Sequence, residues 1–192
     1  MAKRLLSFAS VALLVAALPV HAQIAQVRTS KAQSFGTVEN GVYHNNLTSI
    51  QFTLPPEWVI VRQAWASGGA QAVMLRDTVL NEIATVWLKA RVADPADIPA
   101  EMNSRLDARL AQRNNFEGYK YRSESVRHTI IGGQPALSAV ADYVRTGQKM
   151  VEYVTWIDGE KSRVVFAARL PASGLAEFQS RFDPIIQSAE VP

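Results

Sequence analysis

The sequence predicts a layered α+β domain in which helices cover a mostly antiparallel sheet. Two observations lead to this class. Several short segments alternate apolar and polar residues with the period of a strand, and turn signals separate them. Two longer segments carry apolar residues at helical spacing. Each of these amphipathic helices needs a sheet face against which its apolar side is buried.

The chain opens with the three-part pattern of a secretory signal peptide. A basic start at Lys3 and Arg4 precedes an apolar stretch that ends in the small-x-small sequence Val20-His21-Ala22. The apolar stretch is shorter than the roughly 20 residues that a spanning helix needs. We therefore expect residues 1–22 to be removed between Ala22 and Gln23. The mature protein is then periplasmic or secreted, with no stable membrane insertion.

The composition of the mature chain excludes several classes of function. Without Lys3 and Arg4 the mature chain has 18 Lys and Arg residues and 17 Asp and Glu residues, so its net charge is close to zero. Nothing in this charge indicates a nucleic acid partner. The sequence has no Cys, which excludes thiol nucleophiles and thiolate metal sites. Residues 23–40 are polar and aperiodic and predict a flexible N-terminal lead. Residues 41–192 are expected to form a single domain that is large enough to fold without disulfides or a metal ion.

The first half of the domain predicts mainly strands. The segment Leu47–Leu54 places Ile50, Phe52 and Leu54 on one face before a Pro-Pro stop. Further strands are expected at Trp58–Arg62, Ala72–Leu75 and Ala84–Val92, and the last of these alternates along its whole length.

The middle of the domain predicts a helix. Asp94 and Pro95 suit its first turn, and it runs to about Arg113. Its apolar stripe is formed by Met102, Leu106 and Leu110. A strand at Ser125–Ile131 follows it.

The second half predicts two hairpins and a closing helix. Strands Ala136–Arg145 and Lys149–Ile157 meet around Gly147, and Asp158-Gly159 predicts a type I′ turn into the strand Ser162–Leu170. Ser173 is expected to cap the closing helix, whose apolar face includes Phe178 and Phe182.

Three stretches resemble PsbP-like proteins, and together they extend from about Tyr43 to the C-terminus. They are Tyr43-His44-Asn45 with the strand that runs through Pro55-Pro56 to Trp58, Ile131-Gly132-Gly133-Gln134-Pro135-Ala136, and the closing segment from Phe178 to Ser188. The resemblance implies an α/β/α sandwich built on a central antiparallel sheet. It also implies a binding or assembly module, and no catalytic residue is carried over from it.

No catalytic or metal-binding constellation is evident in the sequence. The mature chain has two histidines, His44 and His128, with no Ser-hydrolase elbow, no zinc motif and no phosphate loop. Both histidines fit solvated or hydrogen-bonded positions. We therefore expect no catalytic residue, no metal and no cofactor.

One pair of carboxylates is an exception to the expected lack of catalytic residues. If Gly147 is the centre of its turn, Asp142 and Glu152 face each other across the hairpin and could serve a hydrolase. Like charges directly opposite each other are destabilising. The alternatives are a register that differs by one residue, or two solvated acids.

A stripe of arginines is the most distinctive surface feature. Arg105, Arg109 and Arg113 recur every four residues on one side of the predicted helix. Such a stripe could bind a carboxylate, a phosphate or an acidic partner. The alternative is a solvated helix face.

Three of the four tryptophans have an expected place. Trp58 fits the core and Trp65 fits an exposed loop, whereas Trp87 either packs under a helix or marks a binding surface. The leading functional hypothesis is an exported, non-catalytic domain that binds or assembles with another cell-envelope protein. The alternative is a small periplasmic ligand-binding protein or hydrolase that uses the acidic groups or the arginine stripe.

Overall fold

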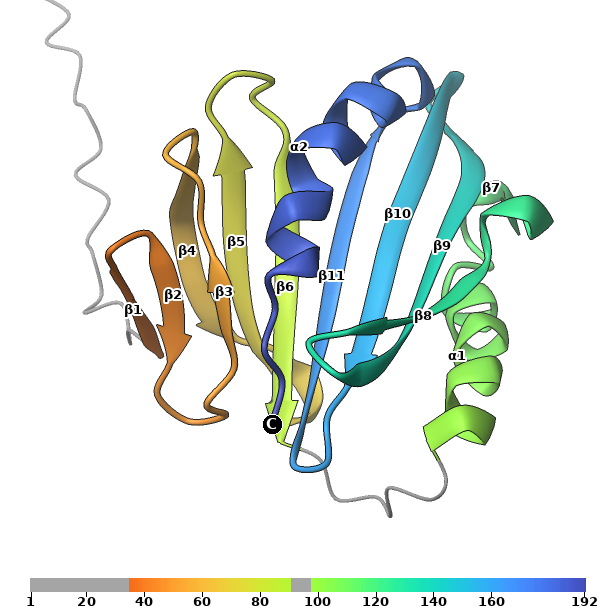
Figure 1. Cartoon of the computed structure of the whole chain (residues 1–192). Coiled ribbons are helices and arrows are strands. Elements are labelled where there is room, and N and C mark those ends of the chain that lie inside the picture. The colour runs from red at the N-terminus through yellow and green to blue at the C-terminus, as the bar shows by residue number, and fades with distance from the viewer. Residues whose placement is uncertain (1–34, 91–97) are drawn as a thin grey trace, which may run out of the picture. The chain divides into compact units, whose positions relative to one another are not determined.

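The computed structural model describes residues 35–90 and 98–192 (Figure 1). The expected signal peptide with its Ala22–Gln23 cleavage site, and the helix start at Asp94, lie outside the described residues. Within the described part of the chain, no helix is both long and apolar enough to cross a membrane.

Two antiparallel sheets form the framework, which confirms the predicted α+β class (Figure 1). The larger sheet has eight strands, and β8 (Arg127–Ile131) pairs with β9 beside its main path. The other seven strands lie in the order β4 (Trp58–Trp65), β5 (Gln71–Asp77), β6 (Ile83–Ala90), β11 (Ser162–Pro171), β10 (Gln148–Asp158), β9 (Gln134–Arg145) and β7 (Glu117–Tyr121). The smaller sheet consists of β1 (Gly36–Glu39), β2 (Val42–Asn45) and β3 (Gln51–Thr53).

Helix α2 (Leu175–Gln187) covers one face of the large sheet (Figure 1). Phe178 and Phe182 are fully buried, as predicted, and the Phe182 ring stacks on Trp58 with centroids 5.3 Å apart. Phe52 of the small sheet joins the same core through Phe166 of β11. The expected cap at Ser173 is wrong, because a 3-10 turn over Ala172–Gly174 leads into α2 and no side chain caps the helix.

Helix α1 (Ile98–Gln112) packs on the opposite face of the large sheet. Leu106 contacts a cluster formed by Leu137, Ala139, Val154, Trp156 and Ala167. Leu110, expected in the core, is instead 42% exposed. The side chain of Met102 lies outside the described residues. The helix is therefore rotated from the predicted orientation.

The N-terminal limit of the predicted domain is wrong. Gly36–Glu39 is not part of a flexible lead but forms β1, which pairs with β2 along its whole length. Phe35 before it is buried against Trp65, with the ring centroids 4.9 Å apart. Strand β7 was also not predicted, because Glu117–Tyr121 is short and contains a glycine and no aliphatic residue that would mark a buried face.

The two hairpins differ from the predicted turns by one or two residues. Strands β9 and β10 meet at a two-residue turn of Thr146 and Gly147, whose φ angles are 50° and 77°. In the next hairpin Asp158 pairs with Arg163, so Glu160-Lys161 is the turn and Asp158-Gly159 is not. A Cβ on Gly159 would lie 2.3 Å from the carbonyl oxygen of Pro192, so close packing explains that glycine.

Candidate functional site

Strand β10 carries two fully buried carboxylates toward α1. Side chains alternate along a strand, so Glu152, Val154, Trp156 and Asp158 point to one face. Val154 and Trp156 belong to the cluster that Leu106 contacts, which identifies this face as the α1 side. A buried carboxylate needs charged or hydrogen-bonding partners. The arginines of α1 and β11 supply them.

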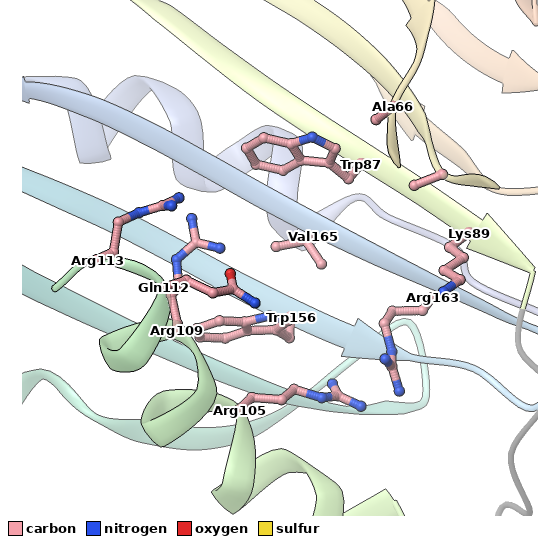
Figure 2. Close-up of a pocket in the computed structure, with 11 residues that line it drawn as sticks. Ala66, Trp87, Lys89, Arg105, Arg109, Gln112, Arg113, Trp156, Arg163 and Val165 are labelled. Carbon is pink, nitrogen blue, oxygen red and sulfur yellow. The ribbon is translucent and has the colours of Figure 1, made fainter. Parts of the chain in front are cut away.

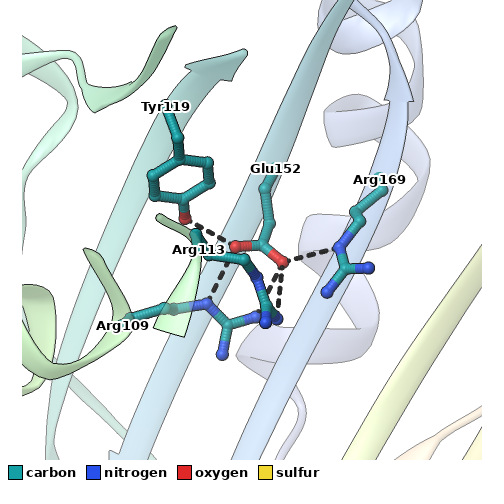
Figure 3. Close-up of polar contacts among 5 residues, drawn as sticks. All are labelled: Arg109, Arg113, Tyr119, Glu152 and Arg169. Atoms are coloured by element: carbon teal, nitrogen blue, oxygen red, sulfur yellow. Dashed lines mark hydrogen bonds and ion pairs between the residues drawn. The ribbon is translucent and has the colours of Figure 1, made fainter. Parts of the chain in front are cut away.

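Glu152 is surrounded by three guanidinium groups and one phenol (Figure 3). Arg109 donates from Nε to Oε2 and from Nη2 to Oε1, both at 2.9 Å. Arg169 of β11 donates to Oε1 at 2.8 Å, and Arg113 donates to the same oxygen at 3.3 Å. The hydroxyl of Tyr119, on β7, donates to Oε2 at 2.6 Å.

These partners keep the Glu152 carboxylate ionised. Burial alone would raise its pKa, but the hydrogen bonds and positive charge of Arg109, together with Tyr119 and Arg169, outweigh burial and lower the pKa to about 2. A carboxylate with this pKa and no open lone pair is a poor general base near neutral pH. The arrangement therefore fits charge balance better than catalysis.

Asp158 forms a second, smaller ion cluster at the other end of β10. Arg163 donates from Nε to Oδ1 at 2.6 Å, and Arg105 of α1 forms an ion pair with Oδ2. All three arginines of the predicted stripe thus lie against the sheet: Arg105, Arg109 and Arg113 are 10%, 11% and 18% exposed. The interpretation as a solvated helix face is wrong, because Glu152 and Asp158 require these charges.

A cleft of about 450 Å³ lies between the arginine stripe and strands β6 and β11. Figure 2 shows Trp87 on one side, Arg109 and Gln112 of α1 on the other, and Val165 between them. None of the described residues that line it is acidic, and five are basic: Lys89, Arg105, Arg109, Arg113 and Arg163. The cleft therefore combines an apolar floor with a positively charged rim.

Two donors at the rim have no partner of their own among the described residues. Arg113 Nε is buried and donates to no acceptor there. The exposed ammonium of Lys89 forms no ion pair with any group in residues 35–90 or 98–192, and Arg163, two residues beyond the turn, lies beside it in Figure 2. A buried donor usually binds an acceptor, which applies to Arg113 Nε, and the exposed ammonium of Lys89 adds an unpaired positive charge beside it; both suit the oxygen atoms of an acid.

The structure does not bring Asp142 and Glu152 together. Asp142 lies opposite Val151, so it points to the other face of the sheet from Glu152, as the alternative of a one-residue register difference predicted. Asp142 instead binds Arg122 through two hydrogen bonds, of 2.8 and 2.7 Å. His44 lies on β2 and exposed His128 on β8. Among the described residues no group of His, Asp and Glu could hold a metal ion.

The predicted burial of Trp58 and exposure of Trp65 are confirmed, but Trp65 ends strand β4 and does not lie in a loop. Trp58 is buried and Trp65 is 53% exposed. Trp87 is half-buried and lines the cleft. Trp156 lies beneath Arg109, with the guanidinium carbon 5.7 Å from the ring centroid.

Several site residues were not identified from the sequence: Tyr119, Trp156, Arg163 and Arg169. The alternation of β11 contained a usable signal, since Arg163 and Arg169 lie on the face opposite Val164 and Phe166. Tyr119 offered none, because its strand was not predicted.

The comparisons with known proteins concern the fold. The solution structure of cyanobacterial PsbP (CyanoP) from Synechocystis sp. PCC 6803 is similar with a TM-score of 0.56 and 14% identity, over 84% of this chain and 99% of that one. The crystal structure of LpqN, involved in cell envelope biogenesis of Mycobacterium tuberculosis, is similar with a TM-score of 0.52 and 13% identity, over 75% and 84%. No family model matches the sequence, and no curated protein matches it. The chain therefore has the PsbP-like fold.

Proposed function

We propose that this protein is an exported, non-catalytic binding domain whose cleft beside α1 holds the acidic group of a small ligand. The observation that carries the proposal is the composition of the cleft: five basic side chains and two tryptophans line it, and no described acidic residue does. Its volume of about 450 Å³ falls in the range of about 300–1,000 Å³ typical of small-molecule sites.

The balance of charge supports an anion. Lys89 lines the cleft, and five arginines pair with the two buried carboxylates Glu152 and Asp158: Arg105, Arg109, Arg113, Arg163 and Arg169. The site therefore keeps a surplus of positive charge after its internal ion pairs are formed. A guanidinium has more donors than one carboxylate can accept, so a bound acid can share an arginine with Glu152.

Among the described residues the carboxylates near the cleft are engaged in ion pairs, which supports binding rather than catalysis. Glu152 is held ionised and saturated with donors. Asp142 belongs to a separate ion pair on the other face. Export remains a proposal that rests on the signal-peptide pattern of residues 1–22, and the description of LpqN as involved in cell envelope biogenesis is consistent with it.

Binding can be measured with anilinonaphthalene sulfonate, an aromatic acid that fluoresces in apolar surroundings. We expect saturable binding that weakens as salt rises, since exposed charges are screened over about 10 Å at 0.1 M salt. Lys89→Gln removes a charge that has no ion pair among the described residues, and we expect about two- to fivefold weaker binding.

Lys149→Gln is the matched control, because Lys149 is an exposed lysine of β10 that does not line the cleft. It should leave the affinity unchanged. Equal binding by both variants, with no dependence on salt, would contradict the proposed site.

A second candidate is docking of another cell-envelope protein beside the cleft. Val59 and Ile83, on β4 and β6, are 36% and 43% exposed on the half of this sheet face that α1 does not cover. A pull-down from an envelope fraction with the protein and with a Val59→Lys, Ile83→Lys variant tests it. Retention of every partner by the variant would exclude this surface.

A further inference from the structure

We propose that the ligand is an acid with an elongated apolar body, such as a medium-chain carboxylate, and that this body lies along β11 from Arg163 toward Arg169. This inference rests on the proposed function and adds the chemical class of the ligand. It follows from the order of side chains along β11 and from a second depression beyond Trp87.

The residues of β11 on the α1 side are basic at both ends of the strand and apolar between them. Arg163 is followed by Val165, then by Ala167, and then by Arg169. A basic group thus stands at each end of two small apolar residues. Small residues leave space above a sheet, whereas the neighbouring strands carry larger side chains that rise on both sides.

The strand register extends this pattern across the sheet. Val165 lies between Trp87 of β6 and Trp156 of β10, and it is paired with both. Ala167 lies in the same way between Thr85 and Val154. These two rows are largely apolar. Trp87, Thr85 and Val165 are partly exposed, whereas Trp156, Val154 and Ala167 are buried on the side of the α1 arginines.

A second depression, of about 160 Å³, lies on the same strands and shares Trp87 with the first. Its full lining is Ile83, Thr85, Trp87, Glu152, Ala167, Ala168 and Arg169. The carboxylate of Glu152 in this depression is bound by its arginines. From Arg163 to Arg169 the strand advances six residues, which corresponds to about 20 Å at roughly 3.3 Å per residue. An extended chain of about ten to twelve carbons fits within this length.

The charges at the two ends set the direction of the ligand. Arg169 donates to Glu152 and Arg163 donates to Asp158, so the charges of both arginines are partly balanced and the difference between the two ends is Lys89. Lys89 forms no ion pair with a described residue, and Arg163 lies next to it in Figure 2. The acid group therefore belongs at the Lys89–Arg163 end, and the apolar body extends past Trp87 to Ile83.

Isothermal titration with straight-chain carboxylates from acetate to dodecanoate, each below its micelle concentration, tests this assignment. Burial of each CH₂ stabilises a complex enough to increase the affinity about two- to fourfold. We expect the dissociation constant to fall by this factor per added carbon once the chain reaches Trp87. Trp87→Ala should flatten the series, and Trp65→Ala, an exposed tryptophan that does not line the cleft, should not.

Ile83→Asn is a second variant. It does not remove a large side chain from the core, because Ile83 is 43% exposed. It should weaken dodecanoate about fivefold or more and leave hexanoate unchanged, since only the longer chain reaches the second depression.

Equal, weak binding of all chain lengths would overturn the elongated ligand and leave the acid-binding function intact. Absence of binding by every acid, inorganic phosphate included, would overturn the proposed function itself. Chain-length dependence that survives both Trp87→Ala and Ile83→Asn would place the apolar body elsewhere and overturn this inference.

Discussion

Arg109 binds Glu152 across the interface between α1 and the sheet, through two parallel hydrogen bonds of 2.9 Å each. This bidentate pair, with Arg113 and Arg169 on the same carboxylate, joins α1 to β10 and β11. The same helix forms the wall of the cationic cleft. The ion cluster therefore both secures the helix and positions the groups that we propose bind an acid.

Breaking this pair should destabilise the domain strongly. Glu152→Ala leaves three arginines beside an empty position, and loss of one partner of a buried ion pair costs about 3–5 kcal/mol. Urea unfolding of Glu152→Ala, of Arg109→Ala and of the double variant measures it. We expect the double variant to lose less than the sum of the two single losses, because the residues are coupled. Additive losses would contradict the coupling.

Stability should fall in acid because of Glu152. Its folded pKa of about 2 is below the ordinary 4.5, so its contribution is present above pH 4.5 and is lost as the pH falls from about 4.5 to about 2. A shift of this size corresponds to about 3 kcal/mol in total. Urea midpoints measured between pH 7 and pH 2 test this expectation. A Glu152→Gln variant should show a shallower fall, and the same fall as the original protein would contradict the assignment.

Phe182→Ala should cost about 3–5 kcal/mol, as for other fully buried phenylalanines. Its ring contacts Trp58, Phe166 and Phe178, and the cavity would open in the centre of the larger core. Thermal and urea unfolding measure the loss. Glu177→Ala, an exposed change on the same helix, is the control and should stay within about 0.5 kcal/mol.

Two adjacent glycines provide a matched pair. Gly132 and Gly133 both have positive φ, 57° and 81°, in the turn between β8 and β9. A Cβ on Gly133 meets nothing within 4 Å, so Gly133→Ala should cost only the backbone strain of about 1 kcal/mol. A Cβ on Gly132 would lie 2.4 Å from the carbonyl oxygen of Ala189, so Gly132→Ala should cost clearly more. Equal losses of unfolding free energy for the two variants would contradict this expectation, because they would show that the C-terminal segment moves away from the added Cβ at no cost.

The mature protein should begin at Gln23. Intact-mass analysis of protein recovered from an exporting host determines the first residue. A full-length mass in the membrane fraction would contradict removal of residues 1–22.

The elements with a strong hydrophobic periodicity were predictable from the sequence. The elements whose orientation depends on ion pairs between residues far apart in the sequence were not. Alternation placed Ala84, Val86 and Leu88 on a buried face, and all three are fully buried. The helical spacing of Phe178 and Phe182 likewise predicted their burial. In both cases one apolar face decides the structure, and the sequence contains that face.

Helix α1 shows where sequence reasoning was insufficient. Its apolar positions suggested one inward face, yet Leu110 is exposed and Arg109 is turned inward. The cause is Glu152, a residue 43 positions away whose burial depends on the register of β10. That register is set by the two-residue turn of Thr146 and Gly147, which shifts the pairing by one residue from a turn centred on Gly147. No local pattern contains this information.

The central claim is that an acid binds in the cleft beside Trp87, and NMR of the tryptophan indole N–H groups tests it most directly. The four tryptophans give four such signals, which substitution can assign. On titration with decanoate we predict that the Trp87 signal shifts most, with a smaller shift of Trp156 beneath Arg109, while Trp58 in the opposite core stays in place. A saturating titration that shifts only Trp65, or leaves Trp87 unmoved, would contradict the account.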